Sequence, residues 1–147
     1  MKSVLPLALA CLTLSAADRP ARVTVFSSKD MAMSGFGINR LKVYIDRVGH
    51  RLPQNRFFTV ELEPGRHFIS SGAGALIARR EQLTLNLKPG QHVYVLEGLE
   101  PGVWRGRLAL RRITCEDLEG RGLENKLKPV KNQEGILDEK TFPGCED

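Results

Sequence analysis

Three histidines are the residues of this chain best suited to chemistry: His50, His67 and His92. Imidazole nitrogens bind Zn²⁺ and transfer protons near neutral pH, so the three together would organise a metal site or a hydrolase. His67 and His92 stand at matching places of a repeat, each two residues after a Pro-Gly pair. The simpler interpretation, which we favour, is that each ring packs at the rim of an apolar face and bonds a loop carbonyl.

Other catalytic patterns are weak. The sequence has no Gly-x-Ser-x-Gly nucleophile motif, and Ser34–Gly37 lacks the Lys-Ser/Thr pair of a phosphate-binding loop. Glu61 and Glu63 share a strand face, which is more typical of solvent-facing charges than of a catalytic pair. Trp104 follows a Pro-Gly pair; edge packing is favoured, with sugar stacking as the alternative. We therefore predict a non-enzymatic protein with no cofactor and no metal.

The elements that would position these residues are strands. Apolar and polar residues alternate with period two in seven segments, namely 21–27, 40–46, 56–63, 66–71, 82–88, 91–97 and 105–113, with a shorter strand at 50–52. Turns separate them. This pattern predicts an all-β fold, an immunoglobulin-like two-sheet antiparallel sandwich. The loops Ser27–Asn39 and Ser70–Ala75 would lie at its ends, where binding sites are common.

Two Pro-Gly pairs, Pro64-Gly65 and Pro89-Gly90, close the two copies of the repeat. Proline followed by glycine favours a type II turn, because proline fixes φ and glycine accepts a positive φ. If each pair closes a two-residue hairpin, Leu62 faces His67 and Leu87 faces His92. Both rings then lie at the rim of the apolar face.

Two cysteines remain beyond the N-terminal region, Cys115 and Cys145. In an exported protein they are expected to form a disulfide, and unpaired thiols or a bridge between chains are the alternatives. The sandwich would span 18–114, and 115–147 would be a mostly irregular C-terminal extension tied back by this bridge. Closing a loop of about thirty residues stabilises by roughly 3–4 kcal/mol in the chain-entropy model.

A family resemblance rests on four stretches: Arg22–Phe26, Val43–Asp46, Phe58–His67 and Leu85–Gly90. With them, residues 21–113 resemble an uncharacterised bacterial family of small exported or lipoprotein domains. They are also similar to PEGA-type and carboxypeptidase-regulatory-like sandwiches. The resemblance implies an immunoglobulin-like sandwich in the cell envelope, and it carries no catalytic residues.

The N-terminus reads as an export signal. Lys2 precedes a run of about eleven mostly apolar residues, and small residues follow, which predicts a signal peptide over 1–17 with cleavage between Ala17 and Asp18. The alternative is a lipobox ending at Cys11, which would make an outer-membrane lipoprotein. We expect a periplasmic or extracellular protein without a transmembrane span, because the apolar run is too short to cross a bilayer.

Charge divides the chain. Residues 18–115 hold sixteen Lys and Arg, thirteen of them Arg, against eight Asp and Glu, whereas 116–147 hold five against nine. Arginine suits planar anions, so we predict an envelope module, binding or structural, that presents loops and an Arg-rich face to a protein or an anionic polymer or lipid. An exported protein would not meet nucleic acid. A well-solvated basic surface is the plain alternative, and a metal-binding protein or hydrolase on His50, His67 and His92 is the rival.

Overall fold

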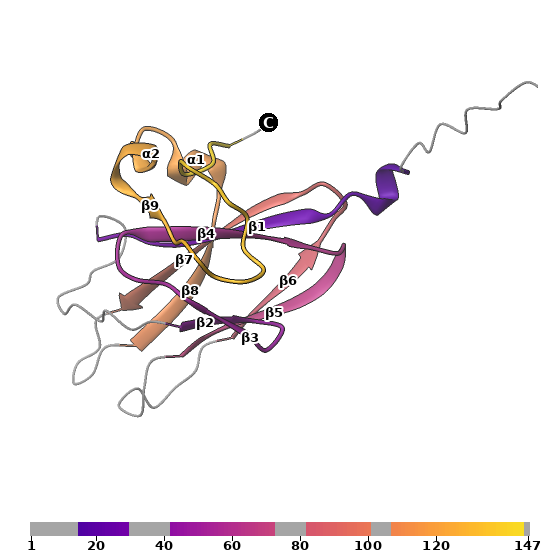
Figure 1. The fold of residues 1–147 in the computed structure, drawn as a ribbon, viewed down its shortest axis with the longest axis horizontal. Coiled ribbons are helices and arrows are strands. Elements are labelled where there is room, and N and C mark those ends of the chain that lie inside the picture. The colour runs from indigo at the N-terminus through magenta and orange to yellow at the C-terminus, as the bar shows by residue number, and fades with distance from the viewer. Residues whose placement is uncertain (1–14, 30–41, 73–81, 101–106, 146–147) are drawn as a thin grey trace, which may run out of the picture.

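The computed structural model describes residues 15–29, 42–72, 82–100 and 107–145, and these form a two-sheet sandwich (Figure 1). A short 3-10 turn, η1 (Ala16–Asp18), precedes the first strand. The strands are β1 (Ala21–Ser27), β2 (Lys42–Ile45), β3 (Val48–Arg51), β4 (Arg56–Leu62), β5 (Gly65–Gly72), β6 (Gln82–Leu87), β7 (His92–Glu100), β8 (Arg107–Ile113) and β9 (Lys128–Pro129). Two helices of one turn, α1 (Cys115–Leu118) and α2 (Leu123–Lys126), lie between β8 and β9.

Sheet A has the strand order β8-β7-β1-β4-β9, and sheet B has the order β3-β2-β5-β6. The predicted all-β sandwich is therefore confirmed. Most neighbouring strands run antiparallel, but β1 lies parallel to β7 and β9 lies parallel to β4. These two pairings depart from the fully antiparallel arrangement that the sequence predicts.

The Pro-Gly segments carry the chain from one sheet to the other, so the hairpin expectation is wrong. Leu62 on β4 pairs with Ala21 of sheet A, while Gly65 on β5 pairs with Leu87 of sheet B. Gly90 has a φ of 70°, and the Gln91 N–H donates to the Lys88 carbonyl at 3.1 Å, which fits a type II turn. Type II turns splay strands apart, which suits a crossing between sheets better than a tight hairpin.

The inward-facing residues of both sheets form the main core. Period-two alternation places Val23 and Val25 of β1, and Val93 and Val95 of β7, on one side of sheet A, where they are almost fully buried. The other members are Ala21 at the start of β1 and residues of β2, β4, β5, β6, β8 and the β3–β4 connection, namely Val43, Ile45, Leu52, Phe58, Val60, Ile69, Leu85, Leu87 and Leu110. The core therefore lies between the sheets.

A second apolar cluster lies on the outer face of sheet A, under the C-terminal extension. The cluster joins large side chains of the sheet to side chains of the extension. The sheet contributes Phe26, Phe57, Tyr94 and Leu96, and the extension contributes Leu118, Leu123, Leu127 and Phe142. The structure pairs Cys115 with Cys145, as the sequence predicts, with their Cα atoms 5.7 Å apart. Figure 1 shows α1 and α2 above sheet A, on the side away from sheet B.

The extension also protects two sheet edges. Its strand β9 pairs with β4, and further along the Leu137 N–H donates to the Thr59 carbonyl at 2.8 Å. The Gln133 side chain accepts from the Arg51 N–H at 2.7 Å and donates to the Arg51 carbonyl at 2.8 Å, so one amide occupies the edge of β3. Unpaired strand edges invite association, and this segment removes part of both.

The outer face of sheet B has no such cover among the residues described. Its outward side chains are exposed or half-buried, and Phe68 is 40% exposed. No helix in the described part of the chain is long and apolar enough to span a membrane.

Candidate functional site

The structure does not bring the three histidines together. His50 faces the main core from β3, with its ring centroid 5.0 Å from that of Phe58, and burial lowers its pKa. Val43 lies opposite both His50 and Ser71, and His67 is four residues from Ser71 along β5. His50 and His67 are therefore separated by roughly 13 Å along the strands and about 10 Å across them.

His67 has both ring nitrogens engaged. Its Nδ1–H donates to Asp46 Oδ2 at 2.5 Å, and its Nε2–H donates to the Glu63 carbonyl at 2.7 Å. Burial by itself lowers the pKa of His67, but the bonds to Asp46 and the Glu63 carbonyl outweigh it and leave that pKa raised. Burial likewise raises the pKa of Asp46, but its bonds with His67 and the Phe68 N–H leave it lowered overall. A ring with two bonded N–H groups offers no lone pair to a metal.

His92 lies on the outer face of sheet A in a buried hydrogen-bond chain. The Thr59 hydroxyl donates to Glu139, and Thr24 Oγ1 lies 2.7 Å from Thr59 Oγ1 and 2.8 Å from His92 Nε2. The single hydroxyl proton of Thr59 is donated to Glu139, so Thr59 accepts from the Thr24 hydroxyl. Thr24 in turn accepts from the Nε2–H of His92. Thr24 and Thr59 are fully buried, so this chain holds the extension against the sheet and offers no accessible nucleophile.

The rival interpretation therefore has no assembled site in the structure. His50 faces the interior and His92 faces the far side of sheet A, so a sheet separates them. Within the described ranges, no group of three His, Cys, Asp or Glu side chains could hold a metal ion.

The remaining residues predicted from the sequence are the cleavage site, Cys11, Trp104, the two candidate loops and the arginines. Ala17 and Asp18 lie in η1 and are exposed. Cys11, Trp104, residues 30–39 of the first candidate loop and 73–75 of the second lie outside the residues described, and Ser70–Gly72 of the second loop are the end of β5. Arginines are spread over both sheets rather than gathered on one face. Arg22, for example, pairs with Glu61 on sheet A at 3.4 Å, and Arg66 lies on sheet B.

The open face of sheet B, meaning its outward positions on β2, β3, β5 and β6, has an unusual composition. The strand registers place these residues on it: Lys42, Tyr44, Gly49, Arg51, Arg66, Phe68, Ser70, Gly72, Gln82, Thr84 and Asn86. Three of them are charged, and all three are cations. The adjoining β2–β3 turn contains one acidic side chain, Asp46, and its carboxylate is hydrogen-bonded to His67 rather than to a cation of this face. In its described positions the face is therefore polar and positively charged.

Tyr44 lies flat on this face. A Cβ added to Gly49 would lie 3.0 Å from Tyr44 Cε1, and one added to Gly72 would lie 2.8 Å from Tyr44 Cε2. Gly49 is on β3 and Gly72 is on β5, so the two ring edges reach toward the strands on either side of β2. A ring standing upright would carry its Cε atoms well above the backbone. The two glycines therefore leave space that only a ring laid along the sheet uses.

Phe68 is the second ring of the open face. It lies on β5 opposite Thr84 of β6, and the Arg66 guanidinium carbon is 5.2 Å from its ring centroid. That distance allows a cation–π contact, which holds the guanidinium over the ring. Phe68 and Val48 are the large apolar side chains that stand most exposed in the described part of the chain.

A basic groove adjoins the open face at Arg51. Arg51, Arg56 and Lys131 line it together with Pro53, Pro129, Val130, Asn132 and Gln133, around a cavity of about 580 Å³. The Arg56 guanidinium is directed by a bond from Nη1 to the Pro129 carbonyl at 3.4 Å. No acidic residue lines the groove, so it continues the positive surface around the side of the sandwich.

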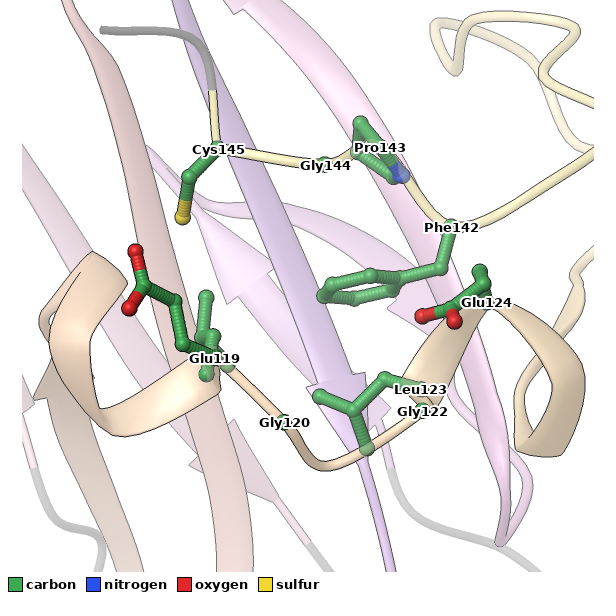
Figure 2. A pocket seen from close by; sticks show the side chains of 10 residues that line it. Glu119, Gly120, Gly122, Leu123, Glu124, Phe142, Pro143, Gly144 and Cys145 are labelled. Carbon is green, nitrogen blue, oxygen red and sulfur yellow. The ribbon is translucent and has the colours of Figure 1, made fainter.

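A different pocket lies within the extension, beside the disulfide. Its volume is about 420 Å³, and Figure 2 shows the Phe142 ring pointing into it, with the carboxylates of Glu119 and Glu124 at its rim. Leu118 and Leu123 contribute apolar walls. The acidic rim makes this pocket unsuited to an anion.

Sequence reasoning missed Glu97. This residue lies on the inward side of β7 and is fully buried, and neither carboxylate oxygen has a hydrogen-bond partner within the described ranges. Burial raises its pKa to about 8, so the side chain is mostly neutral at pH 7. The alternation in His92–Glu97 contains the signal, since Val93 and Val95 share a face with Glu97.

Comparison with known proteins adds no family to this description. Neither a protein-family model nor a curated protein matches the sequence.

Proposed function

We propose that this protein is a non-enzymatic, exported envelope module that binds an anionic polymer through the open face of sheet B and the adjoining basic groove. The observation that carries the proposal is the single sign of charge on the outer face of sheet B, which the described part of the chain leaves uncovered. Lys42, Arg51 and Arg66 supply the charge on the face, and Arg56 and Lys131 extend it into the groove.

A polymer suits this surface better than a small anion does. An exposed ion pair contributes only about 0–1 kcal/mol, so one cation holds an anion weakly. Five cations spread over a face and a groove can engage successive charges of one chain, and each further contact then forms at high effective concentration. The function therefore depends on a repeated negative charge in the partner.

Export of the module is argued from the sequence. The signal peptide expected over 1–17 would place residues 18–147 outside the cytoplasm, where wall and surface polymers carry many carboxylates and phosphates. The bridge between Cys115 and Cys145 suits an oxidising compartment. Mass spectrometry of protein from its native host should find Asp18 at the mature N-terminus, whereas an acylated Cys11 would contradict cleavage at Ala17.

Binding is tested with two polymers of different backbone, polygalacturonate and poly-L-glutamate, titrated by calorimetry against residues 18–147 in 50 mM salt. We expect both to bind, and the Lys42→Gln/Arg66→Gln variant to bind between about twofold and thirtyfold more weakly, since two exposed cations are lost. Lys88→Gln/Lys140→Gln is the control, because it removes the same charge from an inter-sheet turn and from the extension. No binding by the unmodified protein, or equal weakening in both variants, would overturn the proposal.

A further inference from the structure

We infer that the anionic polymer is an acidic polysaccharide, and that one of its sugar rings stacks on Tyr44. This inference rests on the proposed function and adds what charge alone does not give, the chemical class of the ligand. It is carried by the flat seat of Tyr44 between Gly49 and Gly72, together with the polar and cationic side chains around that seat.

The Tyr44 ring lies over two glycines and keeps part of its surface exposed. Tyr44 is half-buried, and its two ring edges lie close to the positions that Cβ atoms would take at residues 49 and 72. Any larger residue at either glycine would push the ring off the sheet. A flat aromatic face next to polar groups is what a sugar ring needs, because its axial C–H bonds pack on the π surface while its hydroxyls point sideways.

The surroundings of the seat match those hydroxyls and a carboxylate. Ser70 lies directly opposite Tyr44 on β5, and Gln82 lies opposite Ser70 on β6, so hydroxyl and amide groups follow one line across the sheet. Lys42 lies two residues from Tyr44 on β2, and Arg51 lies two residues from Gly49 on β3, so both point to the same outer face. Two residues along a strand span roughly 6.6 Å and neighbouring strands lie about 4.8 Å apart, so the long side chains of both cations can reach a sugar stacked on the ring.

Other anionic partners would leave these features unused. An anionic lipid surface or a polypeptide of acidic residues would meet the cations, but neither presents a flat ring with C–H bonds on one side. Among the described residues of the open face, the large apolar side chains are Tyr44 and Phe68, which is little for a protein interface core. Charge complementarity together with a ring seat therefore favours a chain of uronic-acid type.

The test compares Tyr44→Ala and Tyr44→Phe on the two polymers used above. We expect Tyr44→Ala to weaken binding of polygalacturonate about fivefold or more, Tyr44→Phe to change it less than twofold, and neither to affect poly-L-glutamate. Equal losses on both polymers, or no loss on either, would overturn the stacking inference. Failure of the proposed function looks different, because the unmodified protein would then bind neither polymer.

A second measurement needs no substitution. The chain has two tyrosines, so protein labelled with 3-fluorotyrosine gives two ¹⁹F resonances, one from Tyr44 and one from Tyr94 in the second core. Trigalacturonate at saturation should shift the Tyr44 resonance and leave the Tyr94 resonance in place. Saturation without a shift at Tyr44 would show that the sugar binds elsewhere and would overturn the inference.

Discussion

Glu97 is an acidic side chain that the sandwich encloses completely, in a position that its neighbours leave without a hydrogen bond. An ionised carboxylate there would lose its hydration without any compensating partner, so the group keeps its proton and its pKa rises to about 8. This buried carboxyl makes the stability of the fold depend on pH.

The direction of that dependence follows from the proton that each state holds. Below about pH 4.5 both the folded and the unfolded chain hold it, and above that only the folded chain does, so stability falls as pH rises toward 8. We predict that Glu97→Gln stabilises the protein at pH 8 by on the order of 4 kcal/mol and has little effect at pH 4.5. Urea unfolding at both pH values measures this, with exposed Glu61→Gln as the control. An equal effect of Glu97→Gln at both would refute it.

At the scale of elements, the positions of strands were predictable and their assignment to sheets was not. Alternation marks β4, with Phe58 and Val60 on one side, whichever sheet the strand joins. The Pro-Gly repeat has the same local form for a hairpin and for a crossing between sheets, so the partner of Gly65 depends on packing far along the chain. Strand β9 escaped prediction because two residues contain no periodicity.

The bridge between Cys115 and Cys145 fixes the extension at both ends of its path. We predict that Cys115→Ser/Cys145→Ser lowers the free energy of unfolding by about 3–4 kcal/mol, since the unfolded chain regains the freedom of a loop of about thirty residues. Urea unfolding checks this value. Reductant should destabilise the unmodified protein by a similar amount and leave the double variant unchanged; a double variant as stable as the original would show that packing alone holds the extension.

At the scale of the whole molecule, the outer faces of the two sheets differ in what covers them. The extension covers the outer face of sheet A with apolar side chains, whereas no described segment covers the outer face of sheet B, where cations and two rings point outward. Composition predicted an excess of arginine, but it could not say which cations share a face, because that depends on registers such as Lys42 opposite Arg51. The flat seat of Tyr44 was equally hidden. Gly49 faces it across the short β2–β3 turn, but Gly72 lies far along the chain and comes close only because β5 pairs with β2.

This asymmetry predicts that residues 18–114 do not fold without the extension. Removing 115–147 would expose Phe26, Phe57, Tyr94 and Leu96, and each large side chain gains roughly 1.5–3 kcal/mol from burial. The summed loss, roughly 6–12 kcal/mol, is comparable to the whole stability of a small domain, about 5–15 kcal/mol. Circular dichroism and size-exclusion chromatography of the truncated chain should therefore show an unfolded or aggregated protein, while residues 18–145 behave as residues 18–147 do. A monomeric 18–114 that melts cooperatively would mean that the sandwich stands alone and that the extension is an added layer.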